Sequence, residues 1–255
     1  MKPSGLLWKT RLLVARWSYR QRAALPKIRL GTPYGGWTIA PTLLNQNSVC
    51  YCFGAGEDIS FDVQLASRFG AQVVVFDPTP RAQAHFQTAG RVIRREIECP
   101  FREKLCGEYN VDPGVLSRIT FEPVGVWHED TVLKFYAPRD PSAVSHSVLN
   151  LQRTSDFFEA NVRCLRTLMA QFRHESLALV KLDIEGAEYK VLEYICRENI
   201  PIQTLCVEFD EYYNPLDGFW FQRVRDAIGR VLHNGYQLLH IDKHFNVTFV
   251  SQGSA

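Results

Sequence analysis

From residue 41 onward, short apolar runs alternate with segments of helical periodicity, and this alternation constrains the fold more than any other feature. Because parallel neighbouring strands need a crossover connection, the alternation is typical of a mostly parallel sheet flanked by helices. We therefore predict an α/β fold with helices on both faces. Strands are expected near residues 48–53, 72–77, 119–124, 177–183 and 204–209, and helices near 59–69, 80–89, 157–172, 187–198 and 219–233.

Two segments depart from this alternation. In "YQLLHIDKHFNVTFVS", residues 236–251, two β-type runs are separated by only "DKH", which is too short for a crossover helix. An antiparallel hairpin is the remaining arrangement. A second, smaller hairpin is predicted within residues 126–138, as an insertion after the third strand.

The first part of the chain differs in charge from the rest. Every charged side chain before Glu57 is basic, although the formal net charge of the whole chain is only +2. We predict a basic amphipathic helix and a connector within residues 1–40, and one α/β domain over residues 41–255. Lys9 and Arg11 interrupt the apolar run of the helix, so it is neither a signal-peptide core nor a spanning segment.

Two interpretations of this basic helix remain. It packs on the domain with a solvated basic face, which we favour, or it makes peripheral contact with an anionic membrane surface. Nucleic-acid binding is not expected, because no basic stripe continues into the domain. The seven cysteines fall mostly inside strand-like or helix-like runs without zinc spacing, so we expect reduced thiols and a cytoplasmic protein, with membrane association as an option.

A glycine turn follows the first predicted strand. "VCYCFGAGEDISFD" places Gly54 and Gly56 between a strand and a helix, and Asp77 ends the next strand about 20 residues later. Such an acid accepts hydrogen bonds from a ribose diol in nucleotide-binding folds. The alternative is that the glycines close the turn and Asp77 caps the next helix. We favour a nucleotide-containing cofactor, because both features face one crevice at adjacent strand ends.

The residues after the turn select among cofactors. A dinucleotide turn needs a third glycine, and that position holds Ile59 after Glu57 and Asp58. Acids beside the turn suit a cation, such as an ammonium or sulfonium group, better than a pyrophosphate. Together with the C-terminal hairpin, this favours S-adenosylmethionine over a nicotinamide cofactor, and a nicotinamide-dependent oxidoreductase is the alternative.

A second group of acids ends the apolar run of "ALVKLDIEGAEYKVLEYI". Asp183 and Glu185 alternate along the strand, so both enter one pocket only if the chain has begun to turn, as Gly186 allows. Each is a candidate base for a hydroxyl acceptor. His146, in the Ser-rich "SAVSHSVLN", is a third candidate, and its alternative interpretation is an ordinary exposed histidine.

The next strand also ends in acids. Glu208 and Asp210 follow "LCV" in the strand expected beside that of Asp183. Carboxylates from adjacent strand ends suit Mg²⁺, but hydrogen bonding or helix capping accounts for the same residues. We favour these structural roles and assign no metal ligands.

"KLDIEGAEYKVLE" resembles the strand-to-helix signature of the FkbM-type methyltransferases. "FGAGEDISFD", "FDPTP", "VGVW" and "LCVEF" support the resemblance in order, from about Tyr34 to Val250. It implies a Rossmann-like class I methyltransferase fold with a mostly parallel seven-stranded sheet, S-adenosylmethionine as cofactor, and O-methylation of a hydroxyl. The acceptor is a small molecule or a glycan: a sugar, a glycolipid or a natural product.

The resemblance also implies roles for individual residues. Gly54 and Gly56 line the cofactor, Asp77 binds the ribose, and Asp183 with Glu185 lies beside the transferred methyl group. Cys52 replaces an acid often found two residues before the first glycine, which leaves the methionine ammonium to Asp58 or, alternatively, Glu57. A catalytically silent binding module is the third hypothesis, and the presence of Asp183 and Glu185 favours an enzyme. The oligomeric state is left open.

Overall fold

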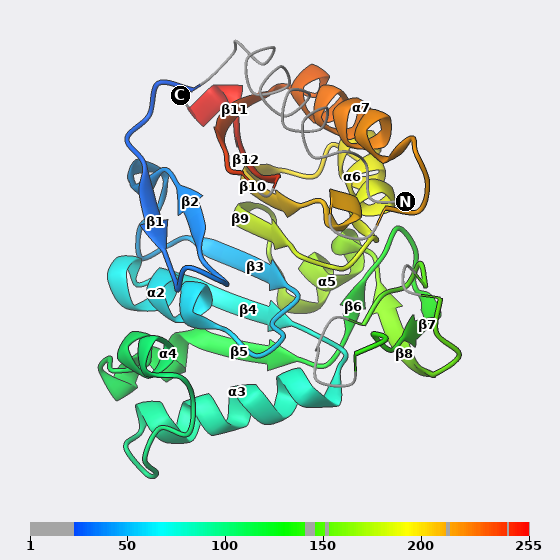
Figure 1. The fold of residues 1–255 in the computed structure, drawn as a ribbon. Helices are drawn as coiled ribbons and strands as arrows, with labels where there is room; N and C mark the ends of the chain where they lie inside the picture. The colour runs from blue at the N-terminus through cyan, green and yellow to red at the C-terminus, as the bar shows by residue number, and fades with distance from the viewer. Residues whose placement is uncertain (1–22, 141–145, 151–152, 213–214, 244, 255) are drawn as a thin grey trace.

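Seven strands form the central sheet of the computed structural model, in the order β11-β12-β10-β9-β3-β4-β5 (Figure 1). Strand β12 runs antiparallel to both neighbours and the other pairs are parallel. The predicted mostly parallel sheet with its C-terminal antiparallel hairpin is therefore confirmed. The strands are β3 (Val49–Phe53), β4 (Gln72–Phe76), β5 (Ile119–Glu122), β9 (Leu177–Leu182), β10 (Ile202–Glu208), β11 (Tyr236–Ile241) and β12 (Asn246–Ser251).

The structure describes residues 23–140, 146–150, 153–212, 215–243 and 245–254. The predicted N-terminal helix lies outside these ranges. Within them, no helix is both long enough and apolar enough to cross a membrane.

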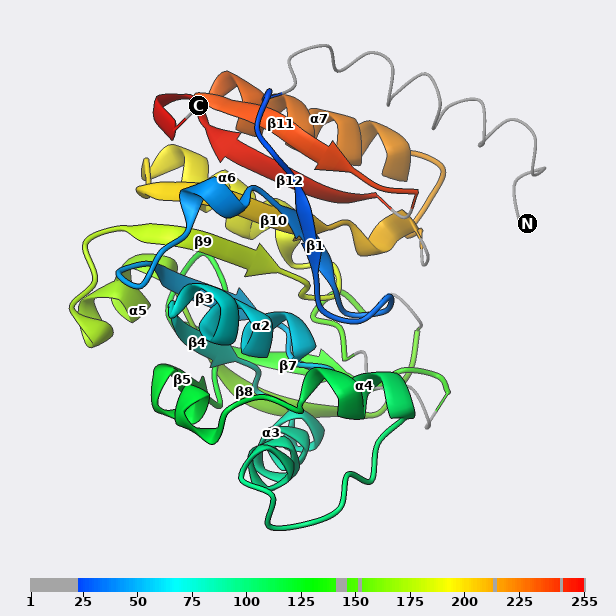
Figure 2. The same ribbon diagram turned by 90° about the vertical axis from the view of Figure 1, so that its left-hand side faces the viewer.

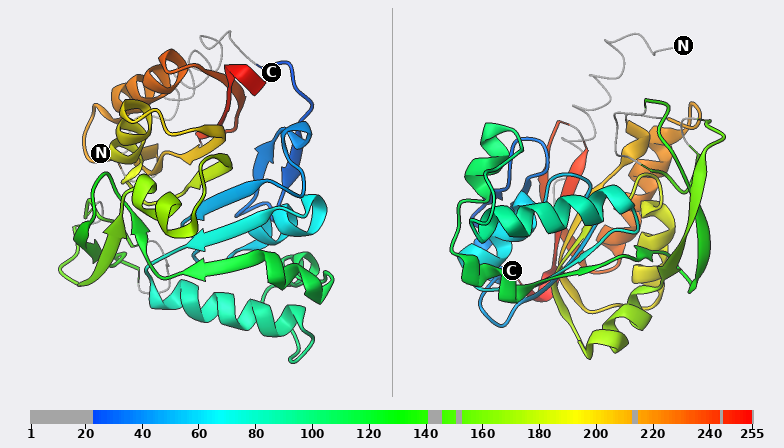
Figure 3. Two further views of the ribbon diagram at one scale, coloured as in Figure 1. Left: turned by 180° about the vertical axis from the view of Figure 1, so that it is seen from behind. Right: turned by 90° about the horizontal axis from the view of Figure 1, so that it is seen from below.

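The sheet has two apolar faces, because side chains alternate along each strand. On β3, Tyr51 and Phe53 enter one buried cluster, and Cys50 and Cys52 enter the other. Helices α5, α6 and α7 cover the first face (Figure 3), whereas α2, α3, α4 and a hairpin, β1–β2, lie on the second (Figure 2). The helices are α2 (Ser60–Phe69), α3 (Pro80–Ile93), α4 (Glu103–Glu108), α5 (Leu165–Phe172), α6 (Glu188–Arg197) and α7 (Trp220–His233).

The helix predicted over residues 157–172 is wrong in its first half. Residues Phe157–Arg163 form strand β8, and only Leu165–Phe172 are helical. The apolar residues of the segment fit a helical period, but pairing with β7 (Thr131–Tyr136) decides the backbone. Phe158 stacks on Phe135 across this pair, at 5.5 Å between ring centroids. Cross-strand aromatic pairs of this kind stabilise a strand against local helical preference.

The hairpin predicted within residues 126–138 is also wrong in its pairing. Strands β6 (Gly125–Val126) and β7 both pair with β8, so a three-stranded sheet forms in the order β6-β8-β7. This small sheet lies at the edge where β3, β4 and β5 end (Figure 1). It therefore contributes a wall at the carboxyl edge of the central sheet.

The segment before the domain forms a second hairpin. Strands β1 (Ile28–Leu30) and β2 (Trp37–Ile39) pair antiparallel, where the sequence predicted only a connector. The hydroxyl of Thr248 on β12 donates to the carbonyl of Thr38, which ties the hairpin to the central sheet. Its turn reaches the start of α2, where the backbone N–H of Thr32 donates to the Ser60 hydroxyl.

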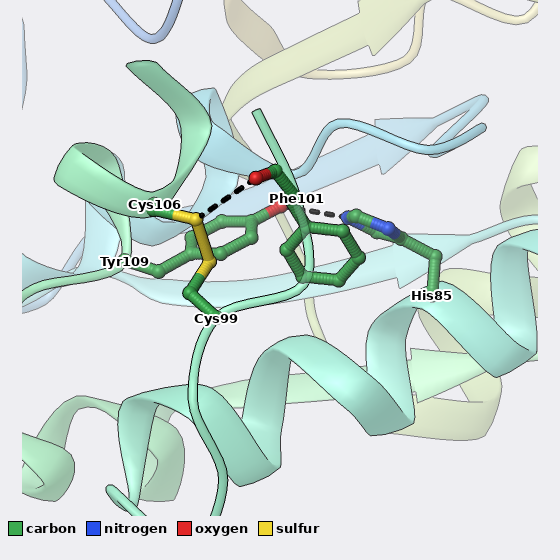
Figure 4. Close-up of a disulfide and its surroundings, with 5 residues drawn as sticks. All are labelled: His85, Cys99, Phe101, Cys106 and Tyr109. Atoms are coloured by element: carbon green, nitrogen blue, oxygen red, sulfur yellow. Dashed lines mark hydrogen bonds between the residues drawn. A yellow bond between two sulfur atoms is a disulfide. The ribbon is translucent and has the colours of Figure 1, made fainter. Parts of the chain in front are cut away.

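Two cysteines form a disulfide, so the prediction that all seven thiols are reduced is wrong. Cys99 and Cys106 join across a short loop with their Cα atoms 5.8 Å apart (Figure 4). Pro100 and the first turn of α4 bring the two residues together, and sequence spacing alone does not encode that approach. Disulfides persist in oxidising compartments, so the cysteines no longer support a cytoplasmic location.

The disulfide predicts a thiol count. The denatured chain should show five reactive thiols before reduction and seven after it, because five cysteines are free. Cys99→Ser with Cys106→Ser should lower the free energy of unfolding by about 2–3 kcal/mol, since a short cross-linked loop restricts the unfolded chain. Mass spectrometry after alkylation and denaturant melts measure the two effects. Seven reactive thiols in protein purified without reductant would contradict the bond.

Candidate active site

A cleft opens at the carboxyl ends of β3, β4 and β9. It has a volume of about 850 Å³ with its open mouth included. Every site residue predicted from the sequence lines it: Gly54, Gly56, Asp58, Asp77, His146, Asp183 and Glu185. The structure therefore brings these residues to one place, while their individual roles stay predictions. Phe76, Val126 and Phe135 add an apolar wall, partly from the small sheet.

Gly54 has to be a glycine because two strand ends meet there. Its φ is +83°, and a Cβ at this position would lie 1.7 Å from the carbonyl oxygen of Asp183. No side chain fits in that space. Gly56, at φ +51°, completes the turn into α2. The glycine turn and the Asp183 strand end are thus in direct backbone contact.

Asp77 holds the glycine turn in shape. Its Oδ2 accepts from the backbone N–H groups of Ala55 and Gly56, at 2.9 and 3.0 Å. Its Oδ1 accepts from the backbone N–H and the hydroxyl of Thr79, at 2.8 and 2.6 Å, at the start of α3. A carboxylate has about four acceptor positions, and protein donors use all of them here. Binding of a ribose by Asp77 stays a prediction, and it requires one of these donors to be exchanged.

Asp58 lies just before the first residue of α2 and fixes the β1–β2 turn. It accepts from the Thr32 hydroxyl at 2.5 Å and from the backbone N–H of Ser60 at 2.9 Å. Gly35 packs directly on this carboxyl group, since a Cβ there would lie 2.8 Å from its carbon. Glu57 forms an exposed ion pair with Arg81. Binding of a methionine ammonium by Asp58 stays a prediction, as does the alternative at Glu57.

The loop between β9 and α6 turns through two left-handed residues. Glu185 has φ +54° and Gly186 has φ +99°. This conformation disfavours residues with a Cβ, so the surrounding structure has to impose it at Glu185. The imposing group is Glu188, whose Oε1 accepts from the backbone N–H groups of Ile184 and Gly186. The turn allows Glu185 and Asp183 to line the same cleft.

Lys181 is a buried cation at the floor of the cleft. Its Nζ donates to the carbonyl of Gly54 at 2.5 Å and lies 3.5 Å from Oδ2 of Asp183. Burial alone would lower the pKa of Lys181, but the charges of Asp183 and the buried Asp62 outweigh it and raise the pKa. Lys181 is therefore charged and fixes the position of the Asp183 carboxylate.

The acids from β9 and β10 form hydrogen-bonded pairs. Glu208 pairs with Asp183, and burial followed by the charges of Asp183 and Glu185 raises the pKa of Glu208 to about 10. Glu208 is thus protonated at neutral pH and donates to Asp183. Asp210 hydrogen-bonds Glu185, and burial raises the pKa of Asp210 to about 7. Among the described residues, no three His, Cys, Asp or Glu side chains are arranged to hold a metal ion.

Sequence reasoning missed Tyr34 as a site residue. It lies in the β1–β2 turn and lines the cleft, although 80% of its surface is exposed. Partial burial, then the nearby charges of Asp183 and Glu185, raise the pKa of its hydroxyl. The only signal in the sequence was the "GTPYGG" segment, whose position over the cleft depends on the long-range bond to Asp58. His146 lies across the cleft against Phe158.

The cleft fits a cationic nucleoside better than a dinucleotide. A pyrophosphate would need the N–H groups of the glycine turn, and those of Ala55 and Gly56 already donate to Asp77. The carboxylates around the turn would repel it. The same carboxylates attract sulfonium and ammonium groups, and the apolar wall accommodates an adenine. The residues present therefore fit S-adenosylmethionine.

Comparison with known proteins agrees with this geometry. A family model described as a methyltransferase FkbM domain matches residues 49–238. "Probable methyltransferase-like protein 24" from Rattus norvegicus is 28% identical over 95 residues, which are 37% of this chain and 23% of that protein. The matched region thus spans under a quarter of the relative's length.

Two solved structures are similar over most of the chain. An rRNA methylase from Streptococcus thermophilus is 9% identical, with 82% of this chain and 90% of that chain covered, at a TM-score of 0.39. TYW2 from M. jannaschii, solved in complex with AdoMet, is 10% identical, with 90% and 88% covered, at a TM-score of 0.32. These scores are too low to establish a shared fold.

The buried Glu188 predicts a pH-dependent stability. Burial raises the pKa of Glu188 to about 8, above its ordinary value of 4.5. The folded state therefore binds a proton that the unfolded state has released, so stability is full below pH 4.5 and falls as pH rises toward 8. Glu188→Gln keeps one acceptor oxygen without the charge, and should lose less stability than the wild type between pH 5 and 8. Denaturant melts across this range measure the difference.

Glu188→Ala serves as the control for this prediction. It removes the acceptor for Ile184 and Gly186 and should be destabilised throughout the range. Parallel pH profiles for the wild type and Glu188→Gln would show that Glu188 does not titrate in this window.

Proposed function

The chain belongs to the FkbM methyltransferase family, and on that premise we propose that it transfers a methyl group from S-adenosylmethionine to a hydroxyl of a sugar, glycolipid or natural-product acceptor. One observation carries the proposal: a glycine turn whose amides are held by Asp77 lies directly against the carboxyl pairs at the ends of β9 and β10. A cofactor site and a site for proton transfer thus share one cleft.

The cofactor is assigned to the glycine turn and the acids beside it. When bound, S-adenosylmethionine supplies an electrophilic methyl group on a sulfonium. Gly54 and Gly56 leave room for the cofactor to approach the backbone closely. Asp58 offers a carboxylate to the ammonium of the methionine part, and Asp183 offers one to the sulfonium. In this assignment, the apolar side chains of Phe76 and Val126 shield the adenine base of the cofactor from water.

The two carboxyl pairs receive different tasks in the proposal. Asp183 is held by Lys181 and by the protonated Glu208, so the proposal assigns it a role in charge and orientation. In the Glu185–Asp210 pair, burial raises the pKa of Asp210 to about 7. A pair that exchanges a proton near this pH suits general-base catalysis at neutral pH. We therefore assign the proton of the acceptor hydroxyl to Glu185. His146 is the alternative acceptor from the opposite wall.

The competing functions fit less well. A nicotinamide-dependent oxidoreductase would need the turn amides that Asp77 occupies. A silent binding module would not need a group that titrates near pH 7 beside the cofactor cleft. A screen for S-adenosylhomocysteine release over hydroxylated sugars, glycolipids and metabolites tests the proposal. Binding of a nicotinamide cofactor in place of S-adenosylhomocysteine would overturn it.

Asp77→Ala should weaken S-adenosylhomocysteine binding at least tenfold. It frees the amides of Ala55 and Gly56 and removes the charged acceptor, and hydrogen bonds to charged groups contribute about 1.5–3 kcal/mol each. Calorimetry on the folded variant measures the affinity. Asp112→Ala is the matched control, because Asp112 makes a similar turn bond to the N–H of Gly114 away from the cleft. Equal affinity of Asp77→Ala and wild type would remove Asp77 from the site.

Glu185→Gln should lower turnover about a hundredfold and leave S-adenosylhomocysteine affinity nearly unchanged, because loss of a base affects the transition state. Burial raises the pKa of Asp210, the hydrogen-bonding partner of Glu185, to about 7, so wild-type turnover should rise with pH as this pair loses its proton, and Glu185→Gln should alter that rise. Asp183→Asn should lower turnover at least tenfold while keeping the rise. Glu193→Gln, on the exposed face of α6, is the control and should match the wild type. Full turnover in Glu185→Gln would transfer the base role to His146.

A further inference from the structure

A second groove lies beside the cofactor cleft, between the β1–β2 turn, α3 and the start of α4. Three residues line both spaces: Tyr34, Glu57 and Asp58. The groove and the cleft are therefore neighbours that meet at these three residues. A ligand bound in the groove would reach the cofactor without crossing the sheet.

The outer wall of this groove is the loop closed by the disulfide. Residues 100–102, 104 and 105 of the loop line the groove. Phe101 packs on His85 of α3, at 4.5 Å between ring centroids (Figure 4). The Sγ of Cys106 lies 3.4 Å from the Phe101 carbonyl, which is a contact and not a hydrogen bond, because a disulfide sulfur carries no hydrogen.

A chain of hydrogen bonds connects this wall to the cofactor side. His85 Nε2 lies 2.7 Å from the hydroxyl of Tyr109, and the same hydroxyl accepts from the backbone N–H of Ile59 (Figure 4). Ile59 directly precedes α2, next to the glycine turn. The wall is therefore held in a fixed position relative to the cofactor cleft by covalent and buried polar contacts.

The loop carries two cations toward the groove. Arg102 and Lys104 are exposed and line it. Within the described ranges neither side chain forms a hydrogen bond or an ion pair with another residue. Arg81, the third cation of the groove, is paired with Glu57. Arg102 and Lys104 thus line the groove without an ion-pair partner, whereas Glu103, the acid between them in the sequence, does not line it.

The cleft itself has the opposite sign. Asp183 and Glu185 line the cleft and not the groove, Asp58 lines both, and Lys181 is the buried cation of the cleft. A negatively charged ligand group is repelled by the carboxylates of the cleft and attracted to the cations of the loop, and both effects are local, because salt screens exposed charges beyond about 8 Å at physiological ionic strength. The carboxylates of the cleft and the cations of the loop therefore favour one orientation of an acceptor, with its hydroxyl in the cleft and its anionic group at the loop.

We propose that this groove binds the anionic part of the acceptor, a phosphate, sulfate or carboxylate group separated from the hydroxyl that is methylated. Arg102 and Lys104 bind the anion, and the disulfide holds them in place. The inference rests on the proposed function for the identity of the ligand as an acceptor. The anion site itself is testable without turnover.

The test compares matched ligands on the full chain saturated with S-adenosylhomocysteine. Glucose, glucose 6-phosphate, glucose 6-sulfate and glucuronate are titrated at constant ionic strength, and the backbone amide NMR signals of residue 99 and residues 101–106 are followed. The three anionic sugars should give saturable shifts in this loop, and glucose should give none. The relative affinities of the three distinguish phosphate, sulfate and carboxylate as the source of the charge.

Two double variants complete the experiment. Arg102→Ala with Lys104→Ala should weaken binding of the anionic sugars at least tenfold, and S-adenosylhomocysteine affinity by calorimetry should stay unchanged. Arg225→Ala with Arg230→Ala, on α7, removes the same charge elsewhere and should leave both affinities as in the wild type. Equal shifts with glucose, or equal weakening in both double variants, would overturn the anion site. Failure of the wild type to bind S-adenosylhomocysteine would instead overturn the proposed function.

Discussion

The close approach of β3 and β9 at their carboxyl ends is the contact on which the rest of the site depends. Glycine at position 54 allows the carbonyl of Asp183 to lie where any Cβ would clash. The meeting of the two strands then places the carbonyl of Gly54 within reach of Lys181. A buried ammonium needs partners, and this one is shared between the glycine turn and the Asp183 carboxylate. The turn and the acids therefore form one unit, and displacement of one would displace the other.

Crowding of carboxyl groups at one strand edge is costly, and the structure reduces that cost with protons. Asp183, Glu185, Glu208 and Asp210 converge from β9 and β10, with Lys181 as the neighbouring cation. If all four acids were ionised, repulsion in a partly buried site would outweigh the single attraction. Protonation of Glu208 turns one repulsive pair into a hydrogen bond. Burial raises the pKa of Asp210 to about 7, and we propose on this ground that its pair with Glu185 takes the proton of the acceptor.

The sequence predicted those parts of the molecule that local chemistry determines. The glycine turn, the acids of "LDIEGAE" and the C-terminal hairpin follow from residue type and spacing; the first two lie where parallel strands end, and the hairpin forms the antiparallel edge of the sheet. Strand β8 was missed because its apolar spacing also fits a helix, and only its pairing with β7 decides. The disulfide and the position of Tyr34 depend on contacts between residues far from any motif. The sequence placed the Glu208 strand beside that of Asp183, but the hydrogen bond between the two acids depends on the burial of Glu208, which the residue types alone do not contain.

The N-terminal hairpin shows why these long-range contacts matter for function. Its turn is held by the hydrogen bond from Thr32 to Asp58. Asp58 also accepts from the backbone N–H of Ser60, the first residue of α2, beside the glycine turn. The same turn carries Tyr34 over the cleft and borders the groove that the disulfide loop closes. In the proposed assignment, the sheet edge supplies the cofactor site, and the hairpin and the loop supply the surface that an acceptor meets. Because such loops vary freely on a fixed sheet, the residues that identify the family are not the ones that select its substrate.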